Sequence, residues 1–500
     1  RVLHKIVTSD PTLNISVIDL PEGLTWNAKR RVVEGTVPEA EGVYHYNIVS
    51  TDGKEQQILA KATLTVKKNL PLAKPMMGWI SWNVVQDKIS TDVVKKVSDA
   101  MVNQGLKDVG YNYLIIDDLW HAKTRHADGR PQEDPAKFPI GMKATVDYAH
   151  SKGLKFGIYS DAANNTCAGA FGSYGKEVID AKQYAAWGVD LLKYDYCHAP
   201  SDAASAQVRY KAMGDALKQS GRDILLYMCE WGAREPWKWG FTTGSPVWRA
   251  TYDTRDGWNG KQGGIGIIQS IASMKDLWAY SGVNRFNDAD MMCVGIHGTG
   301  KSSNDLVVGT PGMTQDEYRT QFALWCMWSS PLLLSFDLTK PITADDKKLM
   351  TNADLIALDQ DDLGQQAEYI GTVDNMVYFM KDLANGDVAI SATNMSEATK
   401  EAVFDFSKFS ALDPTVDYYT YDCQLQKAGE NTVKSVLRAQ VRKHATVVFR
   451  LGRNKITSIS SVSTLKNKKA TVNFDLSGRK VAHPTAGQLV ITDGHPEIVQ

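Results

Sequence analysis

Acidic side chains lie at or just after the ends of apolar runs in the middle of this 500-residue sequence. The seven positions are Asp117, Asp118, Asp161, Asp195, Glu230, Asp253 and Asp290. A single Asp at the end of a strand is commonly a helix cap or a turn former. If these carboxylates lie together at one end of the fold, they repel one another. Such a cluster is expected only where neighbouring cations or a functional role compensate for the repulsion. Two carboxyl groups, one ionised and one protonated, are the minimum equipment for breaking a glycosidic bond.

Two basic residues accompany these acids. Lys193 lies two residues before Asp195, and Arg249 lies four residues before Asp253. Side chains at positions i and i+2 of a strand share a face, so we expect Lys193 to point with Asp195 towards the interior of the fold. A nearby ammonium group favours the ionised form of a carboxylate, which a nucleophile requires.

Other chemistries have less support in the sequence. It has no HExxH or CxxC motif, and His121, His126 and His198 are scattered in predicted loops, so we expect no metal site and no cofactor. No Ser or Cys has the context of a catalytic triad. The 13 Trp and 20 Tyr residues are numerous enough for some to stack on sugar rings, although most aromatic side chains pack in cores.

The overall composition is that of an ordinary globular protein, with 43% hydrophobic and 23% charged residues. The formal net charge of −1 indicates no nucleic-acid partner and no anionic membrane surface. No apolar run approaches the roughly 20 residues that a transmembrane helix needs.

The acids follow a repeating pattern of short apolar runs. The eight candidate strands are MGWISW, YLIIDD, FGIYSDA, VDLLKYD, ILLYMCE, WRATYD, FNDADMM and PLLLSFD. Helix-like stretches lie between most of them, for example over 92–104, 142–151 and 316–328. Eight β/α units in just under 300 residues predict a TIM (β/α)8 barrel over 71–365, with its active site at the C-terminal ends of the strands. A doubly wound sheet would show a glycine-rich turn after its first strand, and that turn is absent from the sequence.

The flanking segments predict two further β domains. Residues 1–70 hold short alternating runs broken by Gly and Pro, which indicate a small N-terminal β-sandwich. Residues 366–453 return to short strands such as DVAISATN and ATVVFRLG, which predict a C-terminal antiparallel β-sandwich. Residues 454–500 are expected to form a polar, β-rich tail. The expected fold class is therefore α/β, with one barrel between two β domains.

Ten ordered motifs resemble those of glycoside hydrolase family 27, the family of α-galactosidases and α-N-acetylgalactosaminidases. They cover roughly residues 74–450 and are MGWISWN, GYNYLIIDDLW, FPIGMK, HSKGLKFGIYSD, TCAGAFGS, WGVDLLKYDYC, CEWG, WRATYDTRDGW, NDADMM and SSPLLLSFDL. The N-terminal segment resembles the immunoglobulin-like modules of bacterial secreted proteins, and the C-terminal tail is similar to those of exported Bacteroidetes proteins.

The resemblance implies a role for each matching residue. Asp195 corresponds to the nucleophile of a retaining hydrolase, and Asp253 corresponds to its general acid and base. The positions that correspond to the sugar site are Trp82, Asp117, Asp118, Tyr159, Cys167, Lys193, Glu230, Arg249, Asp290 and Met291.

The resemblance also implies a disulfide between Cys167 and Cys197. A disulfide indicates an oxidising compartment, so we expect a secreted, periplasmic or cell-surface bacterial protein. The chain departs from the family in two places. Leu119 replaces a cysteine that is common in animal members, and the loop from Val294 to Pro311 is long, which leaves leaving-group recognition open.

Two positions bear on the substrate that the resemblance implies. Glu230 would accept a hydrogen bond from a sugar 2-hydroxyl and would clash with an N-acetyl group, which favours galactose. Asp118 leaves room for a hydroxymethyl group, whereas a longer Glu would favour arabinopyranose. The expected partner is thus an oligosaccharide or polysaccharide that contains galactose. The alternatives are a β-L-arabinopyranosidase, an α-N-acetylgalactosaminidase, or a catalytically idle sugar-binding protein.

Residues 295–302, GIHGTGKS, match the P-loop expression for phosphate binding. A P-loop must connect a buried strand to a helix whose N-terminus holds the phosphate. The following residues are polar and lead to Pro311 and Gly312, with no sign of a helix start. The segment is therefore interpreted as a glycine-rich loop at the barrel mouth.

Overall fold

The structure is a computed structural model that describes residues 1–10, 12–51, 56–260, 263–299 and 311–458, and the backbone of four short strands beyond them. The chain divides into two compact units, residues 1–459 and 460–500. The second unit holds an antiparallel sheet in the order β24-β23-β25-β26. Its strands are β23 (Asn473–Phe474), β24 (Lys480–Val481), β25 (Leu489–Thr492) and β26 (His495–Ile498).

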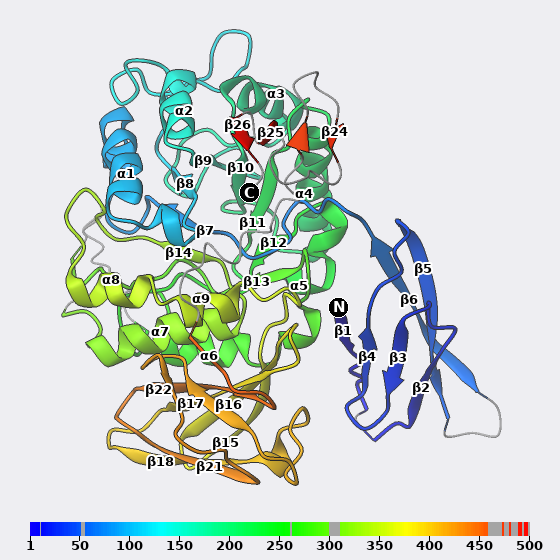
Figure 1. Ribbon diagram of the computed structural model, residues 1–500. Coiled ribbons are helices and arrows are strands. Elements are labelled where there is room, and N and C mark those ends of the chain that lie inside the picture. The colour runs from blue at the N-terminus through cyan, green and yellow to red at the C-terminus, as the bar shows by residue number, and fades with distance from the viewer. Residues whose placement is uncertain are drawn as a thin grey trace. The chain divides into compact units, whose positions relative to one another are not determined.

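The first unit begins with two small antiparallel sheets that face each other as a sandwich (Figure 1). One sheet contains β1 (Val2–Lys5), β4 (Val32–Gly35) and β3 (Leu24–Asn27). The other contains β2 (Ile15–Ile18), β5 (Gly42–Ser50) and β6 (Gln57–Val66). Their inward side chains form one apolar cluster with Val17, Val33 and Tyr46 at its centre. The predicted N-terminal β-sandwich is confirmed.

The middle of the unit is a barrel of eight parallel strands. In chain order they are β7 (Met77–Ile80), β8 (Tyr113–Ile115), β9 (Lys155–Asp161), β10 (Leu191–Asp195), β11 (Leu225–Cys229), β12 (Val247–Arg249), β13 (Phe286–Asp288) and β14 (Leu332–Leu334). From β7 to β13 each strand pairs with the next strand in sequence, and β14 pairs with β7. A bridge between Met292 and Leu334 joins the residues just after β13 to β14 and so closes the ring. All eight predicted strands are present, which confirms the barrel.

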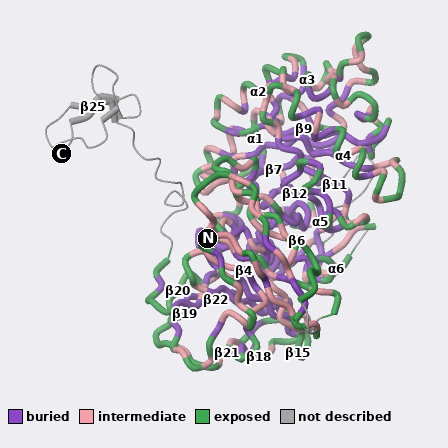
Figure 2. Tube along the Cα trace, turned by 90° about the vertical axis from the view of Figure 1, so that its right-hand side faces the viewer, coloured by how far each residue is buried: buried purple, intermediate pink, exposed green. Residues whose placement is uncertain are grey.

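The barrel interior is a packed core rather than a channel. Ile80, Ile115, Leu191 and Leu333 from four strands belong to one buried cluster, and Figure 2 shows the buried residues concentrated along the barrel strands. Packing is tight enough that a Cβ on Gly78 would lie 2.2 Å from the carbonyl oxygen of the adjacent strand β8.

Helices surround the barrel strands (Figure 1). They are α1 (Thr91–Asn103), α2 (Met142–Ser151), α3 (Glu177–Trp187), α4 (Ala203–Lys218), α5 (Pro236–Trp239), α6 (Ile267–Met274), α7 (Gln315–Met327), α8 (Ala344–Met350) and α9 (Ala353–Asp359). Short 3-10 helices span Gln86–Lys88, Lys107–Val109, Gly240–Thr243, Trp278–Tyr280 and Phe406–Lys408. The three predicted helices coincide with α1, α2 and α7 to within one residue. In the described part of the chain, no helix is long and apolar enough to cross a membrane.

The unit ends in a second sandwich. Its larger sheet has the order β15-β16-β17-β22-β19-β20, and its smaller sheet pairs β18 with β21. The strands are β15 (Glu368–Val373), β16 (Met376–Asp382), β17 (Val388–Asn394), β18 (Lys400–Asp405), β19 (Tyr419–Asp422), β20 (Lys427–Ala428), β21 (Val436–Val441) and β22 (Thr446–Gly452). Phe404, Phe406 and Ile390 lie at the centre of its core. The predicted C-terminal β-sandwich is confirmed.

Candidate active site

The carboxylates predicted from the sequence do gather at the C-terminal ends of the barrel strands. Asp195 is the last residue of β10, and it pairs in register with Asp161 on β9 and with Cys229 on β11. Parallel strands in register place these three positions at the same height, so their side chains share one end of the barrel.

Asp195 is almost completely buried, with 6% of its surface exposed. Its Oδ2 accepts a hydrogen bond from the hydroxyl of Tyr159 at 2.8 Å, and its Oδ1 accepts one from its neighbour's backbone, Tyr196 N–H, at 2.9 Å. The Sγ of Cys167 lies 3.4 Å from Oδ2. That sulfur belongs to the Cys167–Cys197 disulfide, which the structure contains as expected, so it carries no proton to donate.

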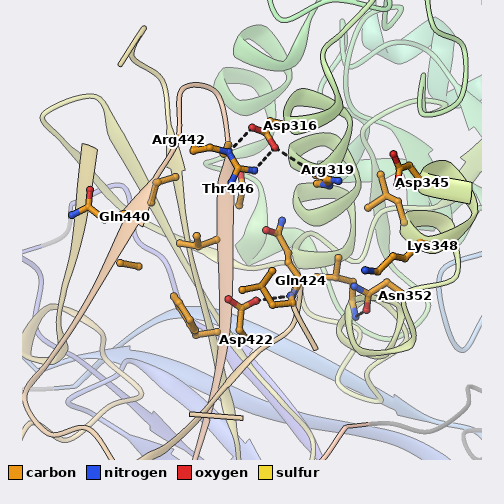
Figure 3. A pocket seen from close by; sticks show the side chains of 18 residues that line it. Asp316, Arg319, Asp345, Lys348, Asn352, Asp422, Gln424, Gln440, Arg442 and Thr446 are labelled. Atoms are coloured by element: carbon orange, nitrogen blue, oxygen red, sulfur yellow. Dashed lines mark hydrogen bonds and ion pairs between the residues drawn. The ribbon is translucent and has the colours of Figure 1, made fainter. Parts of the chain in front are cut away.

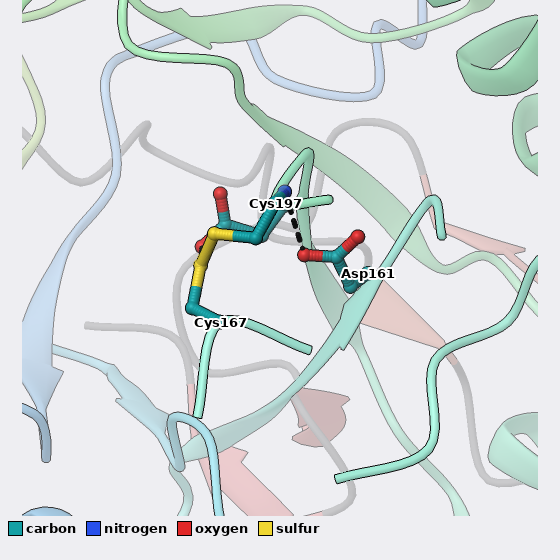
Figure 4. A group of neighbouring side chains, drawn as sticks. Asp161, Cys167 and Cys197 are labelled. Atoms are coloured by element: carbon teal, nitrogen blue, oxygen red, sulfur yellow. Dashed lines mark hydrogen bonds between the residues drawn. A yellow bond between two sulfur atoms is a disulfide. The ribbon is translucent and has the colours of Figure 1, made fainter. Parts of the chain in front are cut away.

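A second buried carboxylate, Asp161, lies beside Asp195. Its Oδ2 accepts a hydrogen bond from Cys197 N–H at 2.9 Å (Figure 4), and its Oδ1 accepts one from Ala163 N–H at 2.9 Å. Burial and the charge of Asp195 raise the pKa of Asp161 to about 9. Burial raises the pKa of Asp195 as well, whereas the charge of Lys193 and the hydrogen bonds from Tyr196 and Tyr159 act against that rise. A close pair of carboxyl groups cannot both be ionised cheaply, and these contacts favour Asp195 as the ionised member.

The same atoms could be mistaken for a metal site. The ligand atoms of Asp161, Cys167, Asp195 and Cys197 all lie within 4.8 Å of one another. Both sulfurs, however, are joined in a disulfide, whereas a cysteine ligand must be a thiolate. This group of residues does not have the donors that a metal ion needs.

Lys193 points into the barrel as predicted, but its bonded partner is not Asp195. Its Nζ donates to Asp117 Oδ2 at 2.7 Å, and both side chains are buried. The neighbouring Asp118 accepts from Ala168 N–H at 3.0 Å, which attaches the loop of the disulfide to the end of β8. Burial raises the pKa of Asp118 to about 6.

Arg249 connects two acids on the opposite side of the ring. Its Nη2 donates to Asp253 Oδ1 at 2.5 Å, and its Nε lies 3.2 Å from Asp290 Oδ1. The Asp253 side chain is 38% exposed, and Arg255 approaches its second oxygen at 3.6 Å. Burial alone would raise the pKa of Asp253, but the two guanidinium groups outweigh it and hold that pKa below its ordinary value.

Glu230 lies buried just after β11, and only one of its two carboxylate oxygens has a hydrogen-bond partner among the described residues. Its Oε2 accepts hydrogen bonds from Arg234 N–H at 3.0 Å and from the Arg234 guanidinium at 3.1 Å. Its Oε1 is buried without a hydrogen-bond partner among the described residues. Burial raises the pKa of Glu230 to about 7. A buried acceptor left open in this way suits a ligand hydroxyl.

The apolar members of the predicted site lie at the end of the barrel core. Met291 belongs to the interior cluster, and the half-buried Trp82 packs against it. A flat indole beside a ring of polar groups is the arrangement expected for one face of a bound sugar.

Several contacts were not predicted from the sequence. Arg234 pairs with Glu230 at helical spacing (i, i+4), and Arg255 approaches Asp253. The Cys229 sulfur accepts from Arg249 at 3.4 Å. The sequence marks Asp161 only as an acid at a strand end. The i, i+4 spacing was the one available signal for Arg234. The Arg249–Cys229 contact joins two neighbouring strands that sequence spacing does not bring together.

The P-loop-like segment lies partly outside the described residues, which stop at position 299 and resume at 311. In its described part, His297 N–H donates to the Tyr318 hydroxyl at 2.9 Å, and His297 Nε2 lies 2.6 Å from Asp346 Oδ2. The next described helix, α7, begins at Gln315. These contacts attach the segment to α7 and α8.

A separate pocket of about 460 Å³ lies between helices α7–α9 and the C-terminal sandwich (Figure 3). Arg442 bonds Asp316 at its edge, at 2.6 and 2.8 Å. Its lining includes none of the barrel-mouth carboxylates. The chemistry at the strand ends, and not this pocket, therefore marks the candidate site.

Comparisons with known proteins agree with this arrangement. The family model described as "Alpha galactosidase A" matches residues 74–361, and the model described as "Putative Ig domain" matches residues 4–67. Alpha-galactosidase A of Cellvibrio japonicus is 36% identical over 413 residues, which is 80% of this chain and 97% of that protein.

Solved structures of similar proteins cover most of the chain. A structure from Bacteroides fragilis described as a "putative alpha-galactosidase" superposes with a TM-score of 0.72 at 34% identity, over 91% of this chain and 94% of that one. Alpha-galactosidase I from Mortierella vinacea gives a TM-score of 0.72 at 30% identity, over 78% of this chain and all of that one.

Proposed function

The chain belongs to glycoside hydrolase family 27, and on this premise we propose that it is a retaining α-galactosidase in which Asp195 is the nucleophile and Asp253 the general acid and base. Catalysis is assigned to the barrel, residues 71–365, with β domains at 1–70 and 366–453 and a tail at 454–500. The observation that carries the proposal is the contrast between the two acids. Asp195 is buried among contacts that favour its ionised form, whereas the Asp253 side chain is 38% exposed and open to a leaving group and to water.

The proposed reaction has two displacements. In the first, an Asp195 oxygen attacks the anomeric carbon and the bond to the leaving oxygen breaks while Asp253 delivers its proton to that oxygen. The product is a β-galactosyl ester of Asp195. In the second, Asp253 takes a proton from water, the water oxygen attacks the anomeric carbon, and the ester bond to Asp195 breaks. The released sugar has the α configuration.

Protonation of Asp253 is proposed to follow sugar binding. In the unliganded site Arg249 lies against Asp253 and favours its ionised form. A sugar 2-hydroxyl that accepts a hydrogen bond from Arg249 would weaken this ion pair, and the sugar would exclude water from the carboxyl group. Both effects raise the proton affinity of Asp253, which is the change that a general acid requires.

The polar groups around the mouth are proposed to bind terminal α-linked galactose. Asp117, Asp118 and Lys193 would bind the 3-, 4- and 6-hydroxyls, while Glu230 Oε1 and Arg249 would bind the 2-hydroxyl. The uncommitted Glu230 Oε1 supports the 2-hydroxyl contact. The remaining members of the proposed pocket are Trp82, Tyr159, Cys167, Asp290 and Met291.

The natural substrate is proposed to be an oligosaccharide or polysaccharide with terminal galactose. The protein is proposed to act in an oxidising compartment, either periplasmic or outside the cell, because its disulfide supports the architecture of the sugar site.

Azide rescue tests the two roles separately. Azide replaces the nucleophile in Asp195→Gly and should give β-galactosyl azide, whereas it replaces the incoming water in Asp253→Gly and should give α-galactosyl azide. Proton NMR distinguishes the two anomers. The assignment would be contradicted if Asp195→Gly gave the α-azide and Asp253→Gly the β-azide. It would also be contradicted if azide rescued neither variant under conditions where the wild type is active.

A panel of aryl glycosides tests the substrate. Aryl α-galactoside should have a higher kcat/KM than aryl β-L-arabinopyranoside or aryl α-N-acetylgalactosaminide. A preference for either of the other two would replace the proposed substrate with that one. Binding of galactose with no turnover of any of the three would indicate an idle binding protein.

A further inference from the structure

Asp256 is a fully buried carboxylate to which the two displacements give no role. Its Oδ2 accepts a hydrogen bond from Gly298 N–H at 2.8 Å, and its Oδ1 accepts one from Met313 N–H at 3.0 Å. The Tyr318 hydroxyl lies 2.8 and 3.0 Å from the two oxygens. One side chain therefore joins the segment after β12 to both described ends of the loop after β13 and to helix α7.

The backbone packs closely around this carboxylate. Gly312 has a positive φ of 88°, and a Cβ there would lie 2.8 Å from Asp256 Oδ2 and 2.5 Å from Gly298 N. Glycine is therefore required at this approach. The Tyr318 hydroxyl also accepts His297 N–H at 2.9 Å. The anchor is rigid because each of its atoms has a fixed partner.

Asp256 lies only three residues after Asp253, and the residues between them are fixed to other elements. Thr254 N–H donates to Asp290 Oδ2 at 2.7 Å, and Arg255 N–H donates to the Ile265 carbonyl at 2.7 Å. Loss of Asp256 would leave these two bonds in place, so the segment would stay attached while its connection to α7 was lost. The Asp253 carbonyl also keeps its bond from Ile265 N–H at 2.8 Å, so the expected consequence is a small shift of the Asp253 carboxyl group rather than an unfolded barrel.

We propose that Asp256 is a positioning residue that holds the general acid and base Asp253 at the leaving oxygen by fixing its segment to α7 and to the loop after β13. This inference rests on the role proposed for Asp253. A displacement of about 1 Å at a catalytic group can cost on the order of 100-fold in rate, so an anchor three residues away is close enough to matter.

The dependence of kcat/KM on the leaving group distinguishes positioning from general damage. The ratio reports formation of the galactosyl ester, in which Asp253 acts only as an acid. An aryl galactoside with an unactivated phenol needs that proton, whereas 2,4-dinitrophenolate leaves without it. Asp256→Asn should lose about 10- to 100-fold on the phenyl substrate, and less than about 3-fold on the dinitrophenyl substrate.

Two further variants keep the test decisive. Tyr318→Phe removes the hydroxyl that contacts both oxygens of Asp256, so it should show the same selective loss to a smaller degree, and it decides the outcome if Asp256→Asn does not fold. The matched control is Asp190→Asn. Asp190 lies just before β10, at the other end of the barrel, where it bonds Phe156 N–H at 2.7 Å and His150 at 2.8 Å. Its loss should leave the leaving-group dependence unchanged.

The failures of the two proposals can be told apart. Equal losses on both substrates in Asp256→Asn and in Tyr318→Phe would overturn the positioning role, provided that Asp253→Ala itself loses activity selectively on the phenyl substrate. If Asp253→Ala shows no such selectivity, the proposed acid role of Asp253 fails instead.

Discussion

At the scale of single residues, the site combines groups of one chemical type in contrasting surroundings. Asp195 and Asp253 are both aspartates near strand ends, yet Asp195 is buried beside Asp161, whose pKa is raised to about 9, whereas Asp253 lies between two guanidinium groups and is partly exposed. Asp161 accounts for part of this contrast, because it takes up the proton that Asp195 would otherwise share. Environment rather than residue type therefore separates the proposed roles.

Glu230 should control the substituent that is tolerated at sugar carbon 2. Glu230→Ala removes the carboxylate that would clash with an acetamido group. The ratio of kcat/KM for aryl α-galactoside to that for aryl α-N-acetylgalactosaminide should therefore fall by about 10-fold or more. Glu235→Ala is the matched control, because Glu235 is exposed and pairs with the exposed Lys238. An unchanged ratio in Glu230→Ala would remove Glu230 from the specificity site.

At the scale of elements, the barrel brings the acids together because parallel strands end at the same height. Alternation along a strand predicts which face of the sheet a side chain lies on, and it correctly predicts that Lys193 points into the barrel. It does not predict the partner across the barrel: Lys193 bonds Asp117, just after β8, instead of Asp195 two residues along its own strand. The Asp256 contacts escaped prediction for the same reason, since they join the segment after β12 to α7 and to a loop, which are distant in sequence.

The ring of strand-end acids should make the fold less stable as the pH rises. Burial raises the pKa of Asp118 to about 6, those of Glu230 and Asp288 to about 7, and, together with Asp195, that of Asp161 to about 9. Each pKa is above that of the unfolded chain, so the native state binds more protons between about pH 4 and pH 9. The stability from these groups is complete below about pH 4 and is lost as the pH rises through 6 to 9.

Urea unfolding at pH 5.5 and pH 8.5 measures this effect. The free energy of unfolding should be lower at pH 8.5, and Asp161→Asn should reduce the difference between the two values. A free energy that increases with pH over this range would contradict the assignment of these pKa values.

The Cys167–Cys197 disulfide should stabilise both the fold and the sugar site. Its sequence separation of 30 residues corresponds to about 3 to 4 kcal/mol of loop-closure free energy. The double variant Cys167→Ser/Cys197→Ser should unfold at lower urea concentration. Its KM should rise, because the loop that donates Ala168 N–H to Asp118 is released. Unchanged KM and urea midpoint would show that the loop is held by its other contacts.

At the scale of the whole molecule, the N-terminal sandwich contacts strands β15 and β16 of the C-terminal sandwich, away from the barrel mouth. Arg30 bonds Asp382 at 2.6 Å, and Lys5 bonds Glu368 at 3.1 Å. Leu3 and Val32 pack with Leu363. The order of sandwich, barrel and sandwich was predictable because each type of element has its own hydrophobic period. The contacts between these parts could not be predicted from the sequence, because they involve single side chains on different strands.

Removal of residues 1–70 should therefore lower stability with little effect on catalysis. The shortened chain should melt at a lower temperature, because Leu3 and Val32 no longer cover Leu363. Its kcat/KM on an aryl α-galactoside should stay within about 3-fold of the full chain, since the described residues of the proposed site all lie beyond position 80. A large loss of kcat/KM in a folded shortened chain would assign the N-terminal sandwich a part in the site.

The central claim is that Asp195 forms a covalent bond to the sugar. The protein should convert an α-galactosyl fluoride that carries a second fluorine on the sugar ring into the galactosyl ester. It should hydrolyse this ester slowly, because the ring fluorine withdraws electrons from the oxocarbenium-like transition state. Mass spectrometry of the digested, inactivated protein should then find the fluorosugar on the peptide that contains LLKYDYC, with fragmentation assigning it to Asp195. A label on Asp161 or Asp253, or a protein inactivated without any attached sugar, would contradict the proposed mechanism.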